Sequence, residues 1–247
     1  MGGKELKMWK NAFGHEKIES FFSFDEIDQI KECIDTLVKD EDRKDYIWKY
    51  YEKDKKTLSR IEYFINYNES LKALSSNDNI MKLVEKKFND KAVLFKDKIN
   101  FKYPSGEGFS AHQDIAASWG EYSNKHITVA IPLCNTDEQN GCIFFGNKTK
   151  NKMTNDFEDL DENILLKPCP TKTGDIVLFD SYVPHASYKN NSDHSRVILF
   201  FTYTPKQHGD FYEKYHADKF RNVPPDIYKI KGKKYRSGNS NSIETVY

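Results

Sequence analysis

The chain has 247 residues, of which 38 are basic and 38 acidic, so its formal net charge at neutral pH is zero. A balanced charge gives no overall field that would favour nucleic acid or an anionic membrane, so we expect neither as a partner and expect local charges to select a small-molecule substrate. The length allows one large domain over residues 1–247.

Neither the cysteines nor the N-terminus indicates secretion. The four cysteines show no Cys-x-x-Cys spacing, which is typical of reduced thiols in the cytosol. The opening residues MGGKELKMWK lack the apolar stretch of a signal peptide, and no apolar run is long enough to span a membrane. We therefore expect a cytoplasmic protein, as a monomer or homodimer.

The N-terminal part, about residues 16–90, is predicted to be mainly helical. Ser23-Phe24-Asp25-Glu26 has the pattern of a capping box, and apolar residues then recur at helical spacing from Ile27 to Val38. Three further segments follow, two of them aromatic-rich strand or coil and the last a short helix: Tyr46–Tyr51, Thr57–Tyr67 and Asn79–Phe88.

The sequence from about residue 91 to 205 changes to short strands. Ala92–Tyr103 alternates, which predicts one apolar face with Val93, Phe95, Ile99 and Phe101 and one polar face with Lys96, Lys98, Asn100 and Lys102. No helical pattern separates the strands, so they favour a sandwich or barrel. The other predicted strands are His126–Leu133, Gly141–Phe145, Gly174–Phe179 and Arg196–Tyr203.

The C-terminal part, residues 206–247, is predicted to hold a helix over Asp210–Phe220. It is followed by a tail, Arg236–Ser242, whose small polar residues are typical of disorder.

A metal site is indicated by His112-Gln113-Asp114. Residues two apart on a strand point the same way, and a His and a carboxylate on one face are two ligands of the 2-His-1-carboxylate triad that holds non-haem Fe(II). The pair alone is a weak signal, because this spacing arises often by chance. A later His on another strand must complete it, and His185 fits best, because it follows a predicted strand and a turn ending at Pro184.

An anion is expected beside this site. Arg196 opens the most apolar of the predicted strands, where burying its charge is costly unless it meets an anion. A carboxylate ligand would satisfy the guanidinium in bidentate geometry.

The combination of His-x-Asp, His and Arg resembles the Fe(II)/2-oxoglutarate-dependent dioxygenases, and within them the phytanoyl-CoA dioxygenase superfamily, over about Ile18–Tyr228. The loop Gly106–Phe109 and the His-to-Arg spacing are similar to those of ectoine hydroxylase. The string KINFK, Lys98–Lys102, followed by a glycine loop and HQD, is similar to the 2-aminoethylphosphonate and trimethylaminoethylphosphonate hydroxylases. The chain departs from both at Phe144–Lys148, where PGSH is usual.

This resemblance implies a mainly β fold with flanking helices and a double-stranded β-helix core, the jelly roll or cupin-like architecture. It also implies Fe(II) as cofactor, with 2-oxoglutarate and O2 as co-substrates. The metal ligands would be His112, Asp114 and His185. The residues expected around 2-oxoglutarate are Arg196, Ser187, Thr128, Asn100 and Phe109, and those expected on the substrate side are Lys98, Gln113, Trp119, Phe179 and Phe200.

Two other histidines are not expected to bind the metal: His126 is predicted to be structural, and His194 to lie at the surface.

The resemblance also implies a reaction. Related halogenases carry Gly or Ala where this chain has Asp114, so the carboxylate favours hydroxylation of an unactivated C–H bond. The expected substrate is a small polar, possibly zwitterionic metabolite of the aminophosphonate kind, because Lys98 offers a partner for its anion. The alternatives are a 2-oxoglutarate-dependent oxidase of natural-product biosynthesis (hydroxylation, desaturation or cyclisation), a catalytically inactive jelly-roll binding protein, and a zinc hydrolase, which would leave Arg196 unexplained.

Overall fold

The computed structural model describes residues 14–42, 46–52, 56–146, 165–236 and 243–246. Three segments named in the sequence analysis lie outside this part: the N-terminal ten residues, residues 147 and 148 of the segment that replaces PGSH, and residues 237–242 of the predicted disordered tail. Arg236 itself ends a short strand, β12 (Lys234–Arg236), which pairs with β13 (Ile243–Val246).

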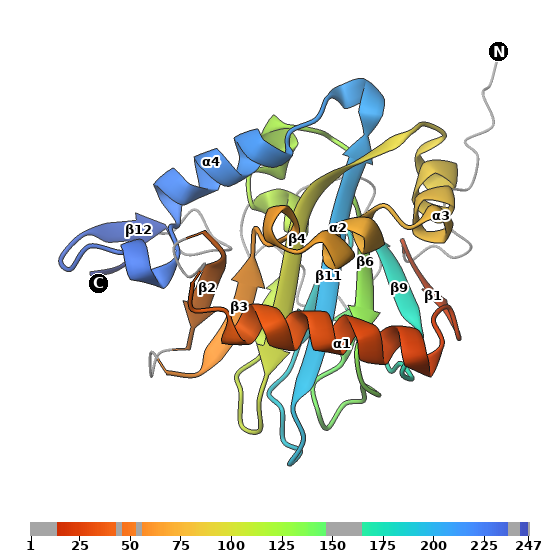
Figure 1. The fold of residues 1–247 in the computed structure, drawn as a ribbon, viewed down its shortest axis with the longest axis horizontal. Coiled ribbons are helices and arrows are strands. Elements are labelled where there is room, and N and C mark those ends of the chain that lie inside the picture. Colours follow the sequence, from red (N-terminus) through yellow and green to blue (C-terminus); the bar gives the residue numbers. More distant parts are fainter. Residues whose placement is uncertain (1–13, 43–45, 53–55, 147–164, 237–242, 247) are drawn as a thin grey trace.

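Two antiparallel sheets form the core, so the predicted mainly β jelly roll with flanking helices is confirmed (Figure 1). In spatial order, the larger sheet contains β1 (His15–Ile18), β9 (Ile176–Asp180), β6 (Ile127–Pro132), β11 (Arg196–Pro205), β4 (Ala92–Lys102), β3 (Leu58–Glu62) and β2 (Trp48–Tyr51). The smaller sheet contains β5 (Phe109–His112), β10 (His185–Ser187), β7 (Ile143–Phe145) and β8 (Lys167–Cys169).

Three helices cover one face of the larger sheet (Figure 1). The predicted capping box is present at α1 (Phe24–Lys39): the Ser23 hydroxyl accepts from the Glu26 amide at 3.2 Å, and the Glu26 carboxylate accepts from the Ser23 amide at 2.8 Å. The predicted helix over Asn79–Phe88 is α3 (Asp78–Phe88). The sequence interpretation missed α2 (Glu69–Ser75), a helix too short to show a clear apolar period.

The predicted C-terminal helix is α4 (Tyr212–Asn222), which lies at the other end of the sheet (Figure 1). Short 3-10 turns complete the described elements: η1 (Ile65–Tyr67), η2 (Asp114–Ala116), η3 (Trp119–Glu121), η5 (Lys206–His208) and η6 (Asp226–Tyr228). Among the described residues, no helix combines the length and the apolar character that crossing a bilayer requires.

The two faces of the larger sheet differ, and the prediction of which residues lie on each face is right for β6 and partly right for β4. Ile127, Val129, Ile131 and Leu133 all pack with the helices in the main apolar core, as the alternation predicts. The opposite face, which carries Thr128, points toward the smaller sheet and the pocket described below.

The prediction that Phe95 belongs to the apolar face of β4 is wrong. The ladder with β11 shifts there, with Lys96 opposite Thr202 and Leu94 opposite Tyr203, so Phe95 is an extra residue in a β-bulge. The bulge reverses the alternation, and Ala92 and Leu94 rather than Val93 and Phe95 join the main core. Phe95 instead packs with Trp119 and Tyr215.

Candidate active site

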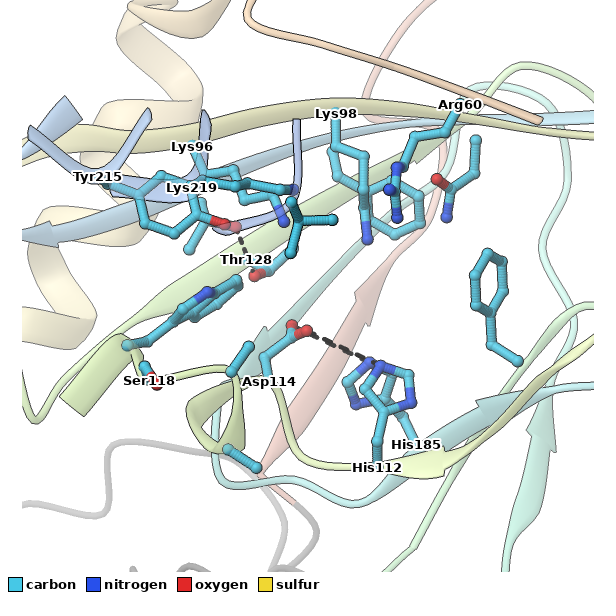
Figure 2. A pocket seen from close by; sticks show the side chains of 18 of the residues that line it. Arg60, Lys96, Lys98, His112, Asp114, Ser118, Thr128, His185, Tyr215 and Lys219 are labelled. Carbon is cyan, nitrogen blue, oxygen red and sulfur yellow. Dashed lines mark hydrogen bonds and ion pairs between the residues drawn. The ribbon is translucent and has the colours of Figure 1, made fainter. Parts of the chain in front are cut away.

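A pocket of about 460 Å³ lies between the two sheets and is closed on one side by α4. His112, Asp114 and His185 stand at one side of it, and Lys96, Lys98 and Lys219 stand across from them (Figure 2). The pocket therefore joins the predicted metal ligands to a second, basic region.

Strand pairing brings the two predicted histidines together. His112 ends β5 and lies directly opposite His185, the first residue of β10. The alternation argument assumed that Asp114 lies on the strand, but Asp114 opens the turn η2. Gln113 keeps an extended backbone, with φ −111° and ψ 129°, so the alternation holds for one residue beyond the strand and Asp114 still points with His112.

The three side chains form a compact group of ligand atoms, all within 4.8 Å of one another. The Asp114 carboxylate lies 3.9 Å from His112 Nε2 and 4.0 Å from His185 Nε2 (Figure 2). This donor set of two imidazoles and one carboxylate, with one face left open, is the one that suits Fe(II).

Backbone carbonyls fix the tautomers of both histidines. His112 Nδ1 is 2.8 Å from the Ser110 carbonyl, and His185 Nδ1 is 3.0 Å from the Val183 carbonyl. A carbonyl only accepts, so each Nδ1 carries the proton and each Nε2 has its lone pair free for a metal.

Burial keeps both rings neutral. It lowers the pKa of His185, and burial, followed by the nearness of the second imidazole, lowers the pKa of His112 to about 3. Burial alone would raise the pKa of Asp114, but His185 and Lys98 keep it below its usual value. The group is therefore ready to bind a cation without losing a proton.

Arg196 lies at the base of the pocket, only 2% exposed. Its Nη2 donates to the Gly141 carbonyl at 2.7 Å, while its Nε has no hydrogen-bond partner among the described residues. Burial lowers the pKa of Arg196 to about 10. An unsatisfied buried donor beside a pocket fits the carboxylate that the sequence predicts there.

Lys102, which the sequence interpretation did not place in the site, lies directly opposite Arg196 in the β4–β11 ladder. Its Nζ donates to Ser187 Oγ at 2.9 Å and to the Tyr188 carbonyl. Burial, followed by the Arg196 charge, lowers the pKa of Lys102 to about 7. Because Lys102 lies on the predicted polar face of β4, together with Lys98 and Asn100, the sequence could have indicated its place in the site.

Two glycines let the backbone come close enough to build this end of the pocket. A Cβ at Gly108 would lie 2.2 Å from the Ser187 carbonyl oxygen. Gly141 has φ +76°, and a Cβ there would lie 2.4 Å from the Tyr188 carbonyl oxygen and 3.0 Å from Lys102 Nζ. A side chain at Gly108 would push the segment before β5 away from Ser187 and Tyr188, and one at Gly141 would push the segment before β7 away from Tyr188 and Lys102.

Most of the remaining predicted residues line the same pocket. Thr128 Oγ1 is hydrogen-bonded to Thr202 Oγ1 at 2.9 Å, and Asn100 Oδ1 has no partner among the described residues. The other predicted residues that line it are Phe109, Phe179, Ser187, Phe200, Lys98 and Trp119.

Gln113 is the exception, since it is not among the lining residues. It alternates to the side opposite the metal ligands, where it is buried and its Nε2 donates to the Tyr182 carbonyl at 2.7 Å. The prediction of a substrate contact for Gln113 is therefore not supported by its position.

Neither His126 nor His194, which the sequence analysis did not expect to bind the metal, belongs to the group of metal-ligating side chains found among the described residues. His126 is buried between the rings of Phe95 and Trp119, at 4.8 and 5.2 Å, and burial lowers its pKa to about 3. His194 is paired with Asp193 in an exposed turn.

Lys98 sits in the wall of the pocket above the Phe200 ring, at 4.6 Å. Burial, followed by the Lys96 charge, lowers the pKa of Lys98 to about 8. The sequence did not predict its neighbours Arg60 and Lys219, which come from β3 and α4. No local pattern could find them, because they are far apart in the chain.

Comparisons with known proteins agree with this geometry. A family model described as phytanoyl-CoA dioxygenase matches residues 12–198. A 2-aminoethylphosphonate dioxygenase from an uncultured bacterium (HF130_AEPn_1) is 35% identical over 96% of this chain and 94% of its own. A methylphosphonate hydroxylase from Gimesia maris is 30% identical over 88% of this chain and 86% of its own.

A solved structure shows the same fold. EctD from S. alaskensis, crystallised with 2-oxoglutarate and 5-hydroxyectoine, has a TM-score of 0.69 and 18% identity, covering 80% of this chain and 74% of its own.

Proposed function

The chain belongs to the phytanoyl-CoA dioxygenase family, and from this premise we propose that it is an Fe(II)- and 2-oxoglutarate-dependent dioxygenase that hydroxylates an unactivated C–H bond of a small polar metabolite. The observation that carries the proposal is the convergence of His112, Asp114 and His185 on one pocket that also holds the buried Arg196. The first three supply the ligands, and Arg196 supplies a cation for the co-substrate.

In this proposal the iron is held by His112 Nε2, the Asp114 carboxylate and His185 Nε2. Iron bound there supplies the activation of O2, coupled to conversion of 2-oxoglutarate into succinate and CO2 and to insertion of one oxygen atom into the substrate. The Ser110 and Val183 carbonyls keep both rings in the tautomer and orientation that this ligation needs.

The far carboxylate of 2-oxoglutarate is assigned to Arg196, with Ser187 and Thr128 beside it, and Asn100 is assigned to the part of the co-substrate nearer the metal. Lys102 adds a second cation behind Ser187. Phe109 and Phe200 line the pocket and exclude water from the bound co-substrate.

The substrate is assigned to the opposite part of the pocket, against Lys98, Trp119 and Phe179. A small zwitterion of the aminophosphonate kind is favoured, because Lys98 offers a cation to its acidic group. The names of the two relatives, a 2-aminoethylphosphonate dioxygenase and a methylphosphonate hydroxylase, support the same class.

The proposal is tested by succinate release with Fe(II), 2-oxoglutarate and air across a panel of aminophosphonates, betaines, amino acids and acyl thioesters. We expect the aminophosphonates to couple to succinate formation and to gain one oxygen atom by mass. Coupling to apolar compounds alone would contradict the substrate class.

Two alternatives would appear as different results. A desaturated or cyclised product without added oxygen would indicate a biosynthetic oxidase. Anaerobic addition of Fe(II) and 2-oxoglutarate without the visible charge-transfer band would indicate a catalytically inactive binding protein.

A further inference from the structure

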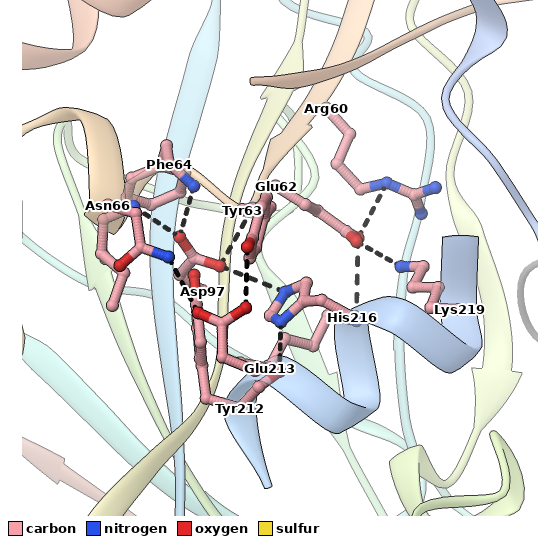
Figure 3. A network of polar contacts seen from close by, with 12 residues as sticks. Arg60, Glu62, Tyr63, Phe64, Asn66, Asp97, Tyr212, Glu213, His216 and Lys219 are labelled. Atoms are coloured by element: carbon pink, nitrogen blue, oxygen red, sulfur yellow. Dashed lines mark hydrogen bonds and ion pairs between the residues drawn. The ribbon is translucent and has the colours of Figure 1, made fainter. Parts of the chain in front are cut away.

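The substrate side of the pocket contains a second charged cluster, built around the buried carboxylate of Glu62 at the end of β3. Glu62 is fully buried and forms ion pairs with Arg60 Nε at 3.1 Å, with Lys96 Nζ at 3.7 Å and with Lys219 Nζ. Figure 3 shows Arg60 and Lys219 converging on Glu62 from β3 and α4. We call Arg60, Lys96, Lys98 and Lys219 the cation group.

All four members of the cation group line the pocket, whereas Glu62 lies behind them. The three cations paired with Glu62 keep the pKa of this carboxyl well below its usual value, although burial alone would raise it. Glu62 is therefore ionised. Burial lowers the pKa of Lys219 well below its usual value, and the direct ion pair of its Nζ with the ionised Glu62 carboxylate is the geometric feature that favours the ammonium form.

The cation group carries more positive charge than Glu62 neutralises. Even with Lys98 left aside, three cations face one carboxylate, which leaves an excess of two. The other carboxylates among the described lining residues are Asp114, Glu121 and Asp218. Asp114 is assigned to the metal, Asp218 is paired with Lys214, and Glu121 is exposed.

A buried excess of positive charge is costly unless an anion compensates it. We propose that the cation group binds the acidic head group of the substrate, and that its excess of two charges matches a doubly charged phosphonate rather than a singly charged carboxylate. This inference rests on the proposed function and adds to it the residues that select the substrate class.

The contribution of Lys219 requires that α4 hold a fixed position, and a separate network supplies this (Figure 3). His216 of α4 is buried, with its Nε2 3.4 Å from the Asp97 carboxylate on β4. Glu213, one turn earlier, accepts from Tyr63 Oη at 2.8 Å and from Asn66 Nδ2 at 3.0 Å.

Asp97 is itself fixed, since its carboxylate accepts from the backbone amides of Tyr63, Phe64 and Ile65 at 2.7 to 3.0 Å. The helix is therefore tied to the segment after β3 and to β4, the strands that carry Arg60, Lys96 and Lys98. Aromatic rings hold two of the cations in place: Arg60 lies over the Tyr50 ring at 4.2 Å and Lys96 over the Trp119 ring at 5.3 Å. The cation group is thus organised before any ligand arrives, which limits the entropy lost on binding.

The test compares 2-aminoethylphosphonate with its carboxylate counterpart, 3-aminopropanoate, by calorimetry on the anaerobic protein with Fe(II) and saturating 2-oxoglutarate. Under these conditions 2-oxoglutarate occupies Arg196 and no turnover occurs. The heat measured on adding either ligand therefore comes from binding at the cation group. At about pH 8, where a phosphonate carries close to two negative charges, we expect it to bind at least about tenfold more tightly than the carboxylate.

Lys219→Met should weaken phosphonate binding roughly 10- to 100-fold and bring the two ligands closer in affinity, because it removes one buried charge. Lys214→Met is the matched control: this lysine is on the same helix and lines the same pocket, but it is paired with Asp218 and exposed, so affinity should be unchanged. If Lys219→Met does not fold, as judged by circular dichroism, Lys96→Met serves in its place.

Equal affinity of the wild-type protein for the two ligands would overturn the inference, and so would equal effects of the Lys219 and Lys214 substitutions. Succinate assays in air separate this result from the parent proposal. Turnover of an aminophosphonate with no effect of Lys219→Met would reject only the cation group. Phosphonate binding that depends on Lys219, without succinate from any compound, would reject only the dioxygenase activity.

Discussion

The two ends of the pocket hold buried cations in opposite ways. At the co-substrate end, Arg196 and Lys102 have only neutral hydrogen-bond partners among the described residues. At the substrate end, Arg60, Lys96 and Lys219 surround the carboxylate of Glu62.

The pKa values reflect this difference. Without a carboxylate, burial lowers the pKa of Arg196 to about 10 and that of Lys102 to about 7. At the other end, Glu62 raises the pKa of Lys96 above its usual value, although burial alone would lower it, whereas burial lowers the pKa of Lys98, which is not in an ion pair with Glu62 among the described residues, to about 8. The paired cations of the substrate end are therefore charged in advance, whereas at the co-substrate end Arg196 is charged but Lys102 is only partly charged near neutral pH.

The largest expected effect comes from removing the carboxylate between the two ends. Asp114→Ala takes away one of three metal ligands and should lower kcat for succinate release by more than about 100-fold, beyond the loss typical of outer-shell changes. Iron content should fall in parallel, while phosphonate binding at the substrate end should persist. Hydroxylation at the wild-type rate would contradict the assignment of the metal ligands.

Arg196→Met tests the co-substrate end alone. Losing a buried charged partner of a carboxylate should raise the KM for 2-oxoglutarate by about 100-fold. The KM for the phosphonate should change little, because the cation group is intact. Equal increases in both KM values would show that the ends are not independent.

Asp97→Asn tests the support of the substrate end. The amide keeps one accepting oxygen but would place its NH2 group against at least one of the backbone amides that Asp97 now accepts from, so the free energy of unfolding in urea should fall by about 2 kcal/mol. Loosening α4 should also raise the KM for substrate but not for 2-oxoglutarate. Asp28→Asn on the surface of α1, where Asp28 forms an exposed ion pair with Lys31, is the control and should change stability by less than about 0.5 kcal/mol.

The smallest expected effect is a pH dependence at Lys102. Only its ammonium form attracts a carboxylate, so 2-oxoglutarate affinity should be highest below the pKa of about 7 and should fall several-fold as pH rises above it. Burial first and then the Arg196 charge lower the pKa of Lys102, whereas Cys142 and Glu107 oppose them. The KM for 2-oxoglutarate, followed from about pH 6 to about pH 9, should lose this component in Lys102→Met. Identical profiles for both proteins would exclude the role of Lys102.

The co-substrate end could be predicted because short local patterns carry it. His112 and Asp114 are two residues apart, and Arg196 begins an apolar strand, so local geometry and burial cost indicated each of them. Of the strands of the larger sheet, β4 and β6 were predicted from their alternation and β9 and β11 from their apolar runs, whereas β1 was not predicted. The single domain and the oligomeric state stay predictions.

The substrate end could not be predicted, because long-range packing assembles it. Arg60 and Lys219 meet only where β3 pairs with β4 and α4 folds back over both. The substrate contact predicted for Gln113 is not supported for a related reason, because tertiary packing decides which side of an extended segment faces the pocket. The bulge at Phe95 could not be predicted either, because apolar and polar residues alternate regularly across this position in the sequence.

That bulge makes the specificity of the pocket depend on strand length as well as on residue identity. The extra residue lets Lys96 line the pocket and Phe95 pack behind its Trp119 and Tyr215, while Ala92 and Leu94 remain in the apolar core. Deleting Phe95 would restore a regular ladder and leave the other faces unchanged, whereas deleting a residue at a regular position of β4 would exchange the faces of every side chain on one side of it. Insertions and deletions in β4, rather than substitutions, are therefore a direct route by which relatives of this protein could acquire a differently charged pocket.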